Sequence, residues 1–352
     1  MKKKLFKTIR FILFLSIGII LLYYAFKGVS LEDFLNSLKK TNYFWLTLSL
    51  LAGVIEYISR AIRWRLLIKP LNYHPPVKNV FFALMVGYTA NFAFPRIGEI
   101  TRCATLRKSD KVPIDLLLGT VLMERAIDLF VLILIFLYVF FVKVGVFGQF
   151  ISEKIFLPVK NALSRTFDLS LWSWLLVILI VGFVFTGIYL LFKKFSKEPL
   201  IKKINKILRG VISGLKTIAK MEDRWKFIFH TIVIWIMYFL MAYLLFFALP
   251  STSVLKPIDG LFIMIIAGIG LSLPIQGGIG VYHILVASAL MIYGIPKTNG
   301  VAYATLSHES QALLIILLGA FSFIMLMIQN KKSKQKYTQN ELSGNTEPKN
   351  NK

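Results

Sequence analysis

The chain alternates between long apolar blocks and short polar connectors. A helix needs about 20 consecutive apolar residues to cross a bilayer. Six blocks reach about that length, near residues 8–26, 42–60, 115–142, 171–192, 227–249 and 299–328. The pattern predicts an all-α fold, a polytopic bundle of transmembrane helices that forms one membrane domain over residues 1–330, and a disordered cytoplasmic tail over 331–352 that is rich in Lys, Asn and Gln.

Two further apolar stretches are interrupted by helix-breaking and polar residues, at corresponding places in the two halves of the chain. The interruptions are Asn91-Phe-Ala-Phe-Pro-Arg-Ile-Gly-Glu99 and Leu273-Pro-Ile-Gln-Gly-Gly-Ile-Gly280. Irregular backbone at membrane depth is tolerated only where protein or a water-filled cavity surrounds it. Paired interruptions of this kind point to the binding site of a transporter.

Composition and charge placement decide which side each connector faces. Apolar residues make up 57% of the chain, and the net charge is +25. Such a charge would suit nucleic acid, but most of the 42 Lys and Arg lie in alternate connectors, as the positive-inside rule describes. We therefore predict a multi-pass protein of the bacterial cytoplasmic membrane with both termini in the cytoplasm, and no nucleic-acid partner.

The same charges predict the path of the two interrupted stretches. Cations on both sides of 78–98 place both of its ends in the cytoplasm, so this stretch must enter the membrane and return. The same logic places both ends of 258–293 outside. The prediction is six full spans plus two re-entrant hairpins, with an inverted repeat of about 5–142 and 171–328. A full crossing by either interrupted stretch would give seven or eight spans.

Charged residues inside a membrane are costly and are therefore candidates for function. Block 115–142 contains Glu124, Arg125 and Asp128, and the spacing of the two carboxylates puts them on one helix face. They could line a hydrophilic cavity for a polar headgroup. A structural ion pair between helices is the alternative, and both interpretations stay open.

Arg96, Glu99 and Arg102 surround the first interruption. Guanidinium groups bind phosphate in bidentate geometry, and a helix that begins after Gly98 would add free backbone N–H groups. We expect this segment to bind an anionic headgroup. A cytoplasmic loop that only obeys the charge rule is the alternative.

The second interruption contains Gln276, Gly277, Gly278 and Gly280. Glycines permit positive φ and close approach of a ligand or a helix, and the glutamine adds donors and an acceptor. We expect a binding segment, with helix packing alone as the alternative.

His283, His308 and Glu309 complete the set of candidate residues. Histidine titrates near neutral pH, so a proton relay is one interpretation and hydrogen bonding between helices is the other. The four histidines lack a metal-binding spacing, so we expect no metal and no cofactor. Three arginines at the end of the second block are expected to extend to the membrane interface: Arg60, Arg63 and Arg65.

Four segments resemble the flippase-like membrane family typified by the transmembrane region of lysylphosphatidylglycerol synthases. They are Arg60-Ala-Ile-Arg-Trp-Arg65, Asn91 to Glu99, Glu124-Arg-Ala-Ile-Asp128 and Gly277-Gly-Ile-Gly280, and the resemblance covers most of residues 5–328. It implies a unit that moves phospholipids, notably aminoacylated phosphatidylglycerol, between leaflets. Because the chain ends shortly after its last block, we expect no aminoacyl transferase domain and no enzymatic activity. His283 departs from the acidic residue that many relatives carry nearby.

The function that these features favour is a lipid flippase or transporter with a central polar cavity. Its partners would be membrane lipids with anionic or zwitterionic headgroups. Arg96 and Arg102 would attract the phosphate, and Glu124 and Asp128 would receive a cationic part. The alternatives are a membrane-embedded transferase acting on a lipid-linked sugar or phospholipid, and an accessory scaffold for an envelope enzyme. A homo-oligomer and a separate lipid-modifying enzyme also stay open as partners.

Overall fold

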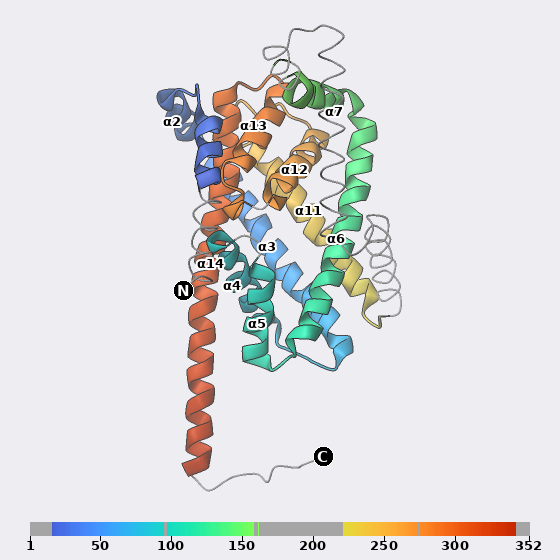
Figure 1. Ribbon diagram of the computed structural model, residues 1–352, viewed down its shortest axis with the longest axis vertical. Coiled ribbons are helices and arrows are strands. Elements are labelled where there is room, and N and C mark those ends of the chain that lie inside the picture. Colours follow the sequence, from blue (N-terminus) through green and yellow to red (C-terminus); the bar gives the residue numbers. More distant parts are fainter. Residues whose placement is uncertain (1–15, 95–96, 158–160, 162–220, 274, 343–352) are drawn as a thin grey trace, which may run out of the picture.

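The computed structural model describes residues 16–94, 97–157, 161, 221–273 and 275–342, and within these ranges it contains helices and no strand (Figure 1). The all-α prediction is therefore confirmed. Four helical segments are long and apolar enough to cross a membrane. They lie in α3 (Tyr43–Ile68, continued by η1, Lys69–Leu71), α6 (Ile114–Val142), α11 (Arg224–Phe246) and α14 (Lys297–Leu342).

Shorter helices complete the described bundle. They are the helix Ser16–Phe26, α2 (Leu31–Lys39), α4 (Val77–Ala93), α5 (Gly98–Asp110), α7 (Val144–Ile151), the π-helical turn η2 (Ser152–Phe156), α12 (Pro257–Ser272), the 3-10 turn η3 (Gln276–Gly278) and α13 (Val281–Ile292).

All of one predicted block and part of another lie outside the described residues, and one predicted segment differs from the structure. The block predicted at 171–192 lies outside the described residues, as does the start of the block at 8–26. At the other end of the chain, α14 continues to Leu342, so the first part of the tail that we predicted to be disordered is helical. The physical reason is local: Lys and Gln have good helix propensity and extend a helix that the preceding apolar span has already nucleated.

The first interrupted stretch forms a hairpin of α4 and α5. Near its open end the Asn79 side chain donates to the Asp110 carboxylate at 3.1 Å, and at its tip the Gly98 amide donates to Asn91 Oδ1 at 2.7 Å. Gly87 and Gly98 let the two helices approach closely, because a Cβ on Gly98 would overlap the Gly87 carbonyl oxygen. The breaker residues thus turn the chain where the sequence predicts.

The second interrupted stretch forms a hairpin of α12 and α13. A Cβ on Gly270 of α12 would lie 3.1 Å from the Cα of Tyr282 in α13. The turn between these helices needs glycine, since Gly277, Gly278 and Gly280 have φ of 57°, 75° and 80°. In Figure 1 this hairpin occupies the upper half of the bundle and the α4–α5 hairpin the lower half.

The connectors gather at two ends of the molecule. At one end, the Asn42 amide donates to the Ala248 carbonyl at 2.8 Å, and the Ser37 hydroxyl donates to Asn299 Oδ1 at 3.1 Å. At the other end, Lys69 Nζ lies 2.6 Å from Asp223 Oδ2. Segments that we predicted on the same side of the membrane therefore lie at the same end.

The long helix α6 shows how the bundle meets its surroundings. Its apolar side chains point largely outward, with Leu122 71% and Phe141 73% exposed. Such a surface would be unfavourable in water and suits contact with lipid. Its Glu124, by contrast, points inward and is fully buried.

Candidate functional site

Six charged side chains from three helices meet in the interior of the described bundle. We call them the buried charge network: Glu56, Arg60 and Arg63 of α3, Arg102 of α5, and Glu124 and Asp128 of α6. Residues three or four apart lie on one helix face, so the three members on α3 share one face and the two on α6 share another. These two faces meet. All except Asp128, whose side chain is 14% exposed, are buried almost completely.

Arg60 occupies the middle of the network. Its Nε donates to Glu56 Oε1 at 2.7 Å, and its Nη1 donates to Glu124 Oε1 at 2.9 Å. The remaining nitrogen, Nη2, donates to the hydroxyl of Tyr238 in α11. Arg60 thereby joins α3 to both α6 and α11.

Arg63 binds Asp128 with two nitrogens. Nη1 donates to Oδ1 at 2.7 Å and Nη2 to Oδ2 at 3.0 Å, the bidentate geometry in which arginine and carboxylate interact most strongly. Arg60 and Arg63 are 2% and 0% exposed. The prediction that these two arginines extend to the interface is therefore wrong, since facing carboxylates on α6 hold them in the interior. Arg65 donates instead to the Pro75 carbonyl.

Among the described members of the network, Arg102 has the most side-chain atoms without a hydrogen-bond partner; Glu56, Arg63 and Glu124 have one each. Its Nη2 lies 3.1 Å from Glu124 Oε2, an ion pair without the alignment of a hydrogen bond. Its Nε, Nη1 and Nη2 donate to no residue that the structure describes, although the side chain is only 1% exposed. The guanidinium stacks on Trp64, 4.5 Å from the ring centroid. Buried donors without acceptors are costly, so this guanidinium is a candidate to bind an acceptor from outside the described residues.

The other charged candidates of the first half lie nearer the surface. Arg125 Nε pairs with Glu99 Oε1 at 2.9 Å, and the side chains are 44% and 41% exposed. This ion pair joins α6 to α5. Arg96 lies outside the described residues.

The tips of the two hairpins touch. A Cβ on Gly277 would lie 2.9 Å from Phe92 Cδ1, so the absence of a side chain lets the Phe92 ring rest against the second turn. Gly280 likewise allows a close contact with the helix Ser16–Phe26, because a Cβ on Gly280 would lie 2.6 Å from the Gly18 carbonyl oxygen. Gln276 and Gly278 are buried beside them.

His283, His308 and Glu309 form a second polar group, which we call the histidine cluster. His308 Nδ1 lies 2.8 Å from Glu309 Oε1, and its Nε2 lies 2.6 Å from the Gly277 carbonyl oxygen. His283 Nε2 lies 3.7 Å from Glu309 Oε1. One nitrogen or oxygen of each of the three side chains lies within 4.8 Å of the others, a grouping that could hold a metal ion. The two candidate groups share no member.

Sequence reasoning missed Glu56, Arg60 and Arg63 as members of a site. A signal was present, because Glu56 and Arg60 are spaced as i and i+4 inside an apolar block, where an ion pair along one helix face is favourable. What the sequence could not show is that this face meets Glu124 and Asp128 of α6.

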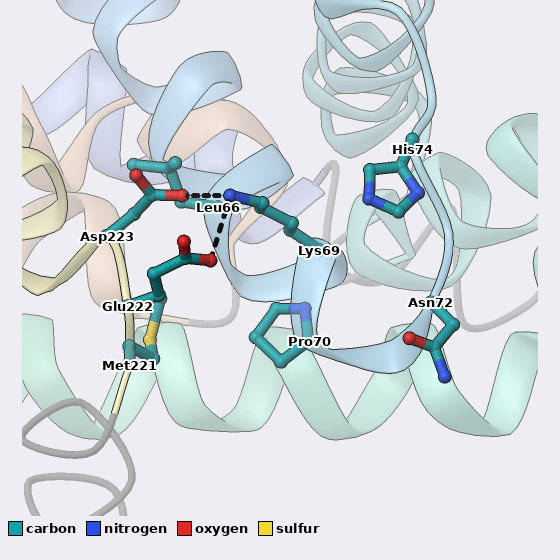
Figure 2. A pocket seen from close by; sticks show the side chains of 8 residues that line it. All are labelled: Leu66, Lys69, Pro70, Asn72, His74, Met221, Glu222 and Asp223. Carbon is teal, nitrogen blue, oxygen red and sulfur yellow. Dashed lines mark hydrogen bonds and ion pairs between the residues drawn. The ribbon is translucent and has the colours of Figure 1, made fainter.

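A pocket lies at the end of α3, and no member of either group lines it (Figure 2). It is lined by Leu66, Lys69, Pro70, Asn72, His74, Met221, Glu222 and Asp223. Lys69 Nζ lies 2.6 Å from Asp223 and 3.4 Å from Glu222, and its ammonium holds the pKa of the Asp223 carboxyl below its ordinary value. Its charged groups are thus already paired with one another.

The helices, their outward apolar surfaces and the buried charges define a multi-pass membrane protein. Residues 11–319 match the family described as the lysylphosphatidylglycerol synthase TM region, and the chain belongs to this family. It is also similar to a UPF0104 membrane protein of Methanocaldococcus jannaschii, at 22% identity over 360 residues, which cover 96% of this chain and 100% of that protein. No solved structure matches the chain.

Proposed function

We propose that the protein moves a lipid with a charged headgroup across the cytoplasmic membrane and that Arg102 binds the anionic part of that headgroup. The observation that supports this proposal is the guanidinium of Arg102, which is 1% exposed and donates to no described acceptor. A phosphate oxygen is the acceptor that a guanidinium fork fits best. The family is described by the name of a phospholipid synthase, which is in keeping with a phospholipid headgroup.

The rest of the network has a different role in this proposal than the sequence suggested. Both oxygens of Asp128 accept hydrogen bonds from Arg63, and Glu124 Oε1 accepts one from Arg60. Glu124 Oε2 forms an ion pair with Arg102, so the charges of both carboxylates are already balanced by arginines. The two carboxylates instead hold the arginines in place and keep the ionic interior intact while the headgroup passes. The protein then acts by binding and release, without covalent chemistry of its own.

The arrangement in the membrane is part of the proposal. Six spans, two re-entrant hairpins and an inverted repeat would bring the two tips together from opposite faces. The contact of Phe92 with Gly277 and the hairpins in opposite halves of the bundle support this arrangement (Figure 1). Both termini would then lie in the cytoplasm, and lipid acyl chains would stay in the bilayer while headgroups pass the tips.

Cysteine labelling tests the predicted sides. Cys103 is fully buried, so the native thiol should give little background. We expect Ser253→Cys, between α11 and α12, to react with a membrane-impermeant maleimide in intact cells, and Lys78→Cys, at the start of α4, to react only after permeabilisation. Both sites are exposed. Reaction of both from the same side would contradict the arrangement.

Lipid movement is tested with Arg102→Lys in vesicles reconstituted with a fluorescent anionic phospholipid. Lysine keeps the charge that faces Glu124 but lacks the planar fork, so the protein should fold while headgroup binding weakens. We expect the transbilayer rate to fall about tenfold, which corresponds to about 1.4 kcal/mol of lost interaction. The measurement is the fraction of label accessible to a reducing agent over time.

The matched control is Arg107→Lys, an exposed arginine on the same helix. It should leave the rate unchanged. Equal rates for Arg102→Lys and the wild type, with both proteins folded, would show that Arg102 does not bind the moving headgroup. Absence of any movement by the wild type above empty vesicles would overturn the proposed function itself.

A further inference from the structure

We propose that the histidine cluster binds a divalent transition-metal ion of the zinc class, with His283, His308 and Glu309 as ligands. The cluster brings together two imidazoles and a carboxylate from α13 and α14, with ligand atoms within 4.8 Å of one another. This site goes beyond lipid movement and does not depend on it.

The first support is the hydrogen bonding of His308. A backbone carbonyl only accepts, so the 2.6 Å contact with Gly277 requires that Nε2 carries the ring proton. Nδ1 then directs a lone pair at Glu309 Oε1, 2.8 Å away, and two such groups need a cation between them, either a proton or a metal. Metal-binding histidines almost always donate their other N–H to a carbonyl or a carboxylate. The Gly277 carbonyl is such a partner.

The second support is independent and concerns His283. The residue is 1% exposed, and its Nε2 lies 3.7 Å from Glu309 Oε1, too far for a hydrogen bond. Its ring lies 5.2 Å from the His308 ring, centroid to centroid. A metal ion bound by both Nε2 and the Glu309 carboxylate would span the 3.7 Å between them.

The geometry is close to that of a bound site. Ligand atoms on a tetrahedral zinc lie about 3.3 Å apart, as bond lengths of about 2.0–2.1 Å require. The separations of 2.8 Å for His308–Glu309 and 3.7 Å for His283–Glu309 fall on either side of this value. Small side-chain rotations that open the first pair and draw in the histidines would complete the site.

A hydrogen bond between α13 and α14 holds the two histidines in place, and the Glu309 side of the cluster is open. Tyr282 and Ser307, the residues that precede the two histidines, are joined by a hydrogen bond of 2.7 Å between their hydroxyls. The Glu309 side chain is 53% exposed, which gives an ion access and leaves a coordination position for water. Imidazole ligands favour Zn²⁺ and its neighbours over Mg²⁺ or Ca²⁺, which prefer oxygen.

The test is the zinc content of the purified full-length protein. The protein is purified with an affinity tag that contains no histidine and is then dialysed against buffered Zn²⁺. Elemental analysis should find one zinc per chain in the wild type. His283→Gln and His308→Gln should lose it. The control variants His74→Gln and His230→Gln change the other two histidines, which lie outside the cluster, and should keep it.

Two further measurements separate a site from nonspecific binding or misfolding. Saturating Zn²⁺ should raise the melting temperature of the wild type by several degrees and leave that of His308→Gln unchanged. Glu309→Gln changes a half-exposed side chain, should fold, and should bind Zn²⁺ at least tenfold more weakly. The proposal is wrong if the wild type binds no zinc, or if the histidine and Glu309 variants bind as much as the controls.

Discussion

Replacing Glu124 with glutamine is expected to destabilise the folded protein by about 3–5 kcal/mol, the range found when one partner of a buried ion pair is removed. The side chain is 0% exposed and its carboxylate lies within ion-pair distance of Arg60, Arg63 and Arg102. Glutamine has the same shape but no charge, so three buried guanidiniums would be left with two carboxylates. Denaturant unfolding in mixed micelles measures the change in the free energy of unfolding.

The matched control is Glu99→Gln, which removes the acidic partner of Arg125. Both of these side chains are more than two-fifths exposed. This pair lies outside the buried charge network, so the variant should lose clearly less stability than Glu124→Gln. If the two glutamine variants lost the same stability, burial of the charge network would not be what makes Glu124 important.

Replacing Gly98 with alanine is expected to cost about 3 kcal/mol, the upper part of the range for overpacking. The added methyl group would overlap the Gly87 carbonyl oxygen and lie 2.7 Å from Asn91 Cγ. The first obstacle is helix backbone, which cannot rotate away as a side chain can. The α4–α5 hairpin must therefore open, and the melting temperature in detergent should fall by several degrees.

Gly119→Ala is the control for this second variant. It lies in α6 with nothing within 4 Å of an added Cβ. Alanine is the better helix former by about 1 kcal/mol, so the melting temperature should stay the same or rise. A similar fall in both alanine variants would show that the contact between Gly87 and Gly98 does not limit the packing of the hairpin.

The fold was predictable where length and helix-breaking residues decide it. The blocks that became α3, α6, α11 and α14 were predicted because a crossing helix must be long and apolar. The turns between α4 and α5 and between α12 and α13 followed from proline and glycine. The helical start of the tail was missed because the tail has no apolar periodicity. Such periodicity is not needed where a segment only extends a helix that has already formed.

The sequence predicted which types of residue form the candidate site better than it predicted which residues pair with one another. Glu124 and Asp128 were selected because charges in an apolar setting are costly, and Arg102 because a guanidinium beside the first interruption can bind phosphate. Arg60 and Arg63 were misplaced, since an arginine near a block end can reach either the interface or a carboxylate on a neighbouring helix, and one sequence does not show which helices are neighbours. The structure resolves this choice by placing α6 beside α3.

The histidine cluster is a second case in which one sequence does not show which helices are neighbours. Spacing along the chain argued against a metal site, because His283 and His308 are far apart in sequence and no short motif joins them. Packing of α13 against α14 brings the two rings to 5.2 Å. A spacing rule detects ligands on one helix, whereas the side chains of the proposed site come from two helices.

The buried charge network contains three arginines and three carboxylates, so with all six ionised its charges cancel. A potential of 100 mV across a bilayer does about 2.3 kcal/mol of work on each elementary charge that it moves through the full field. A neutral group that shifts as one body takes up almost none of this energy. Rearrangements of these helices without a bound headgroup should therefore proceed at the same rate in a polarised cell and in a vesicle without voltage.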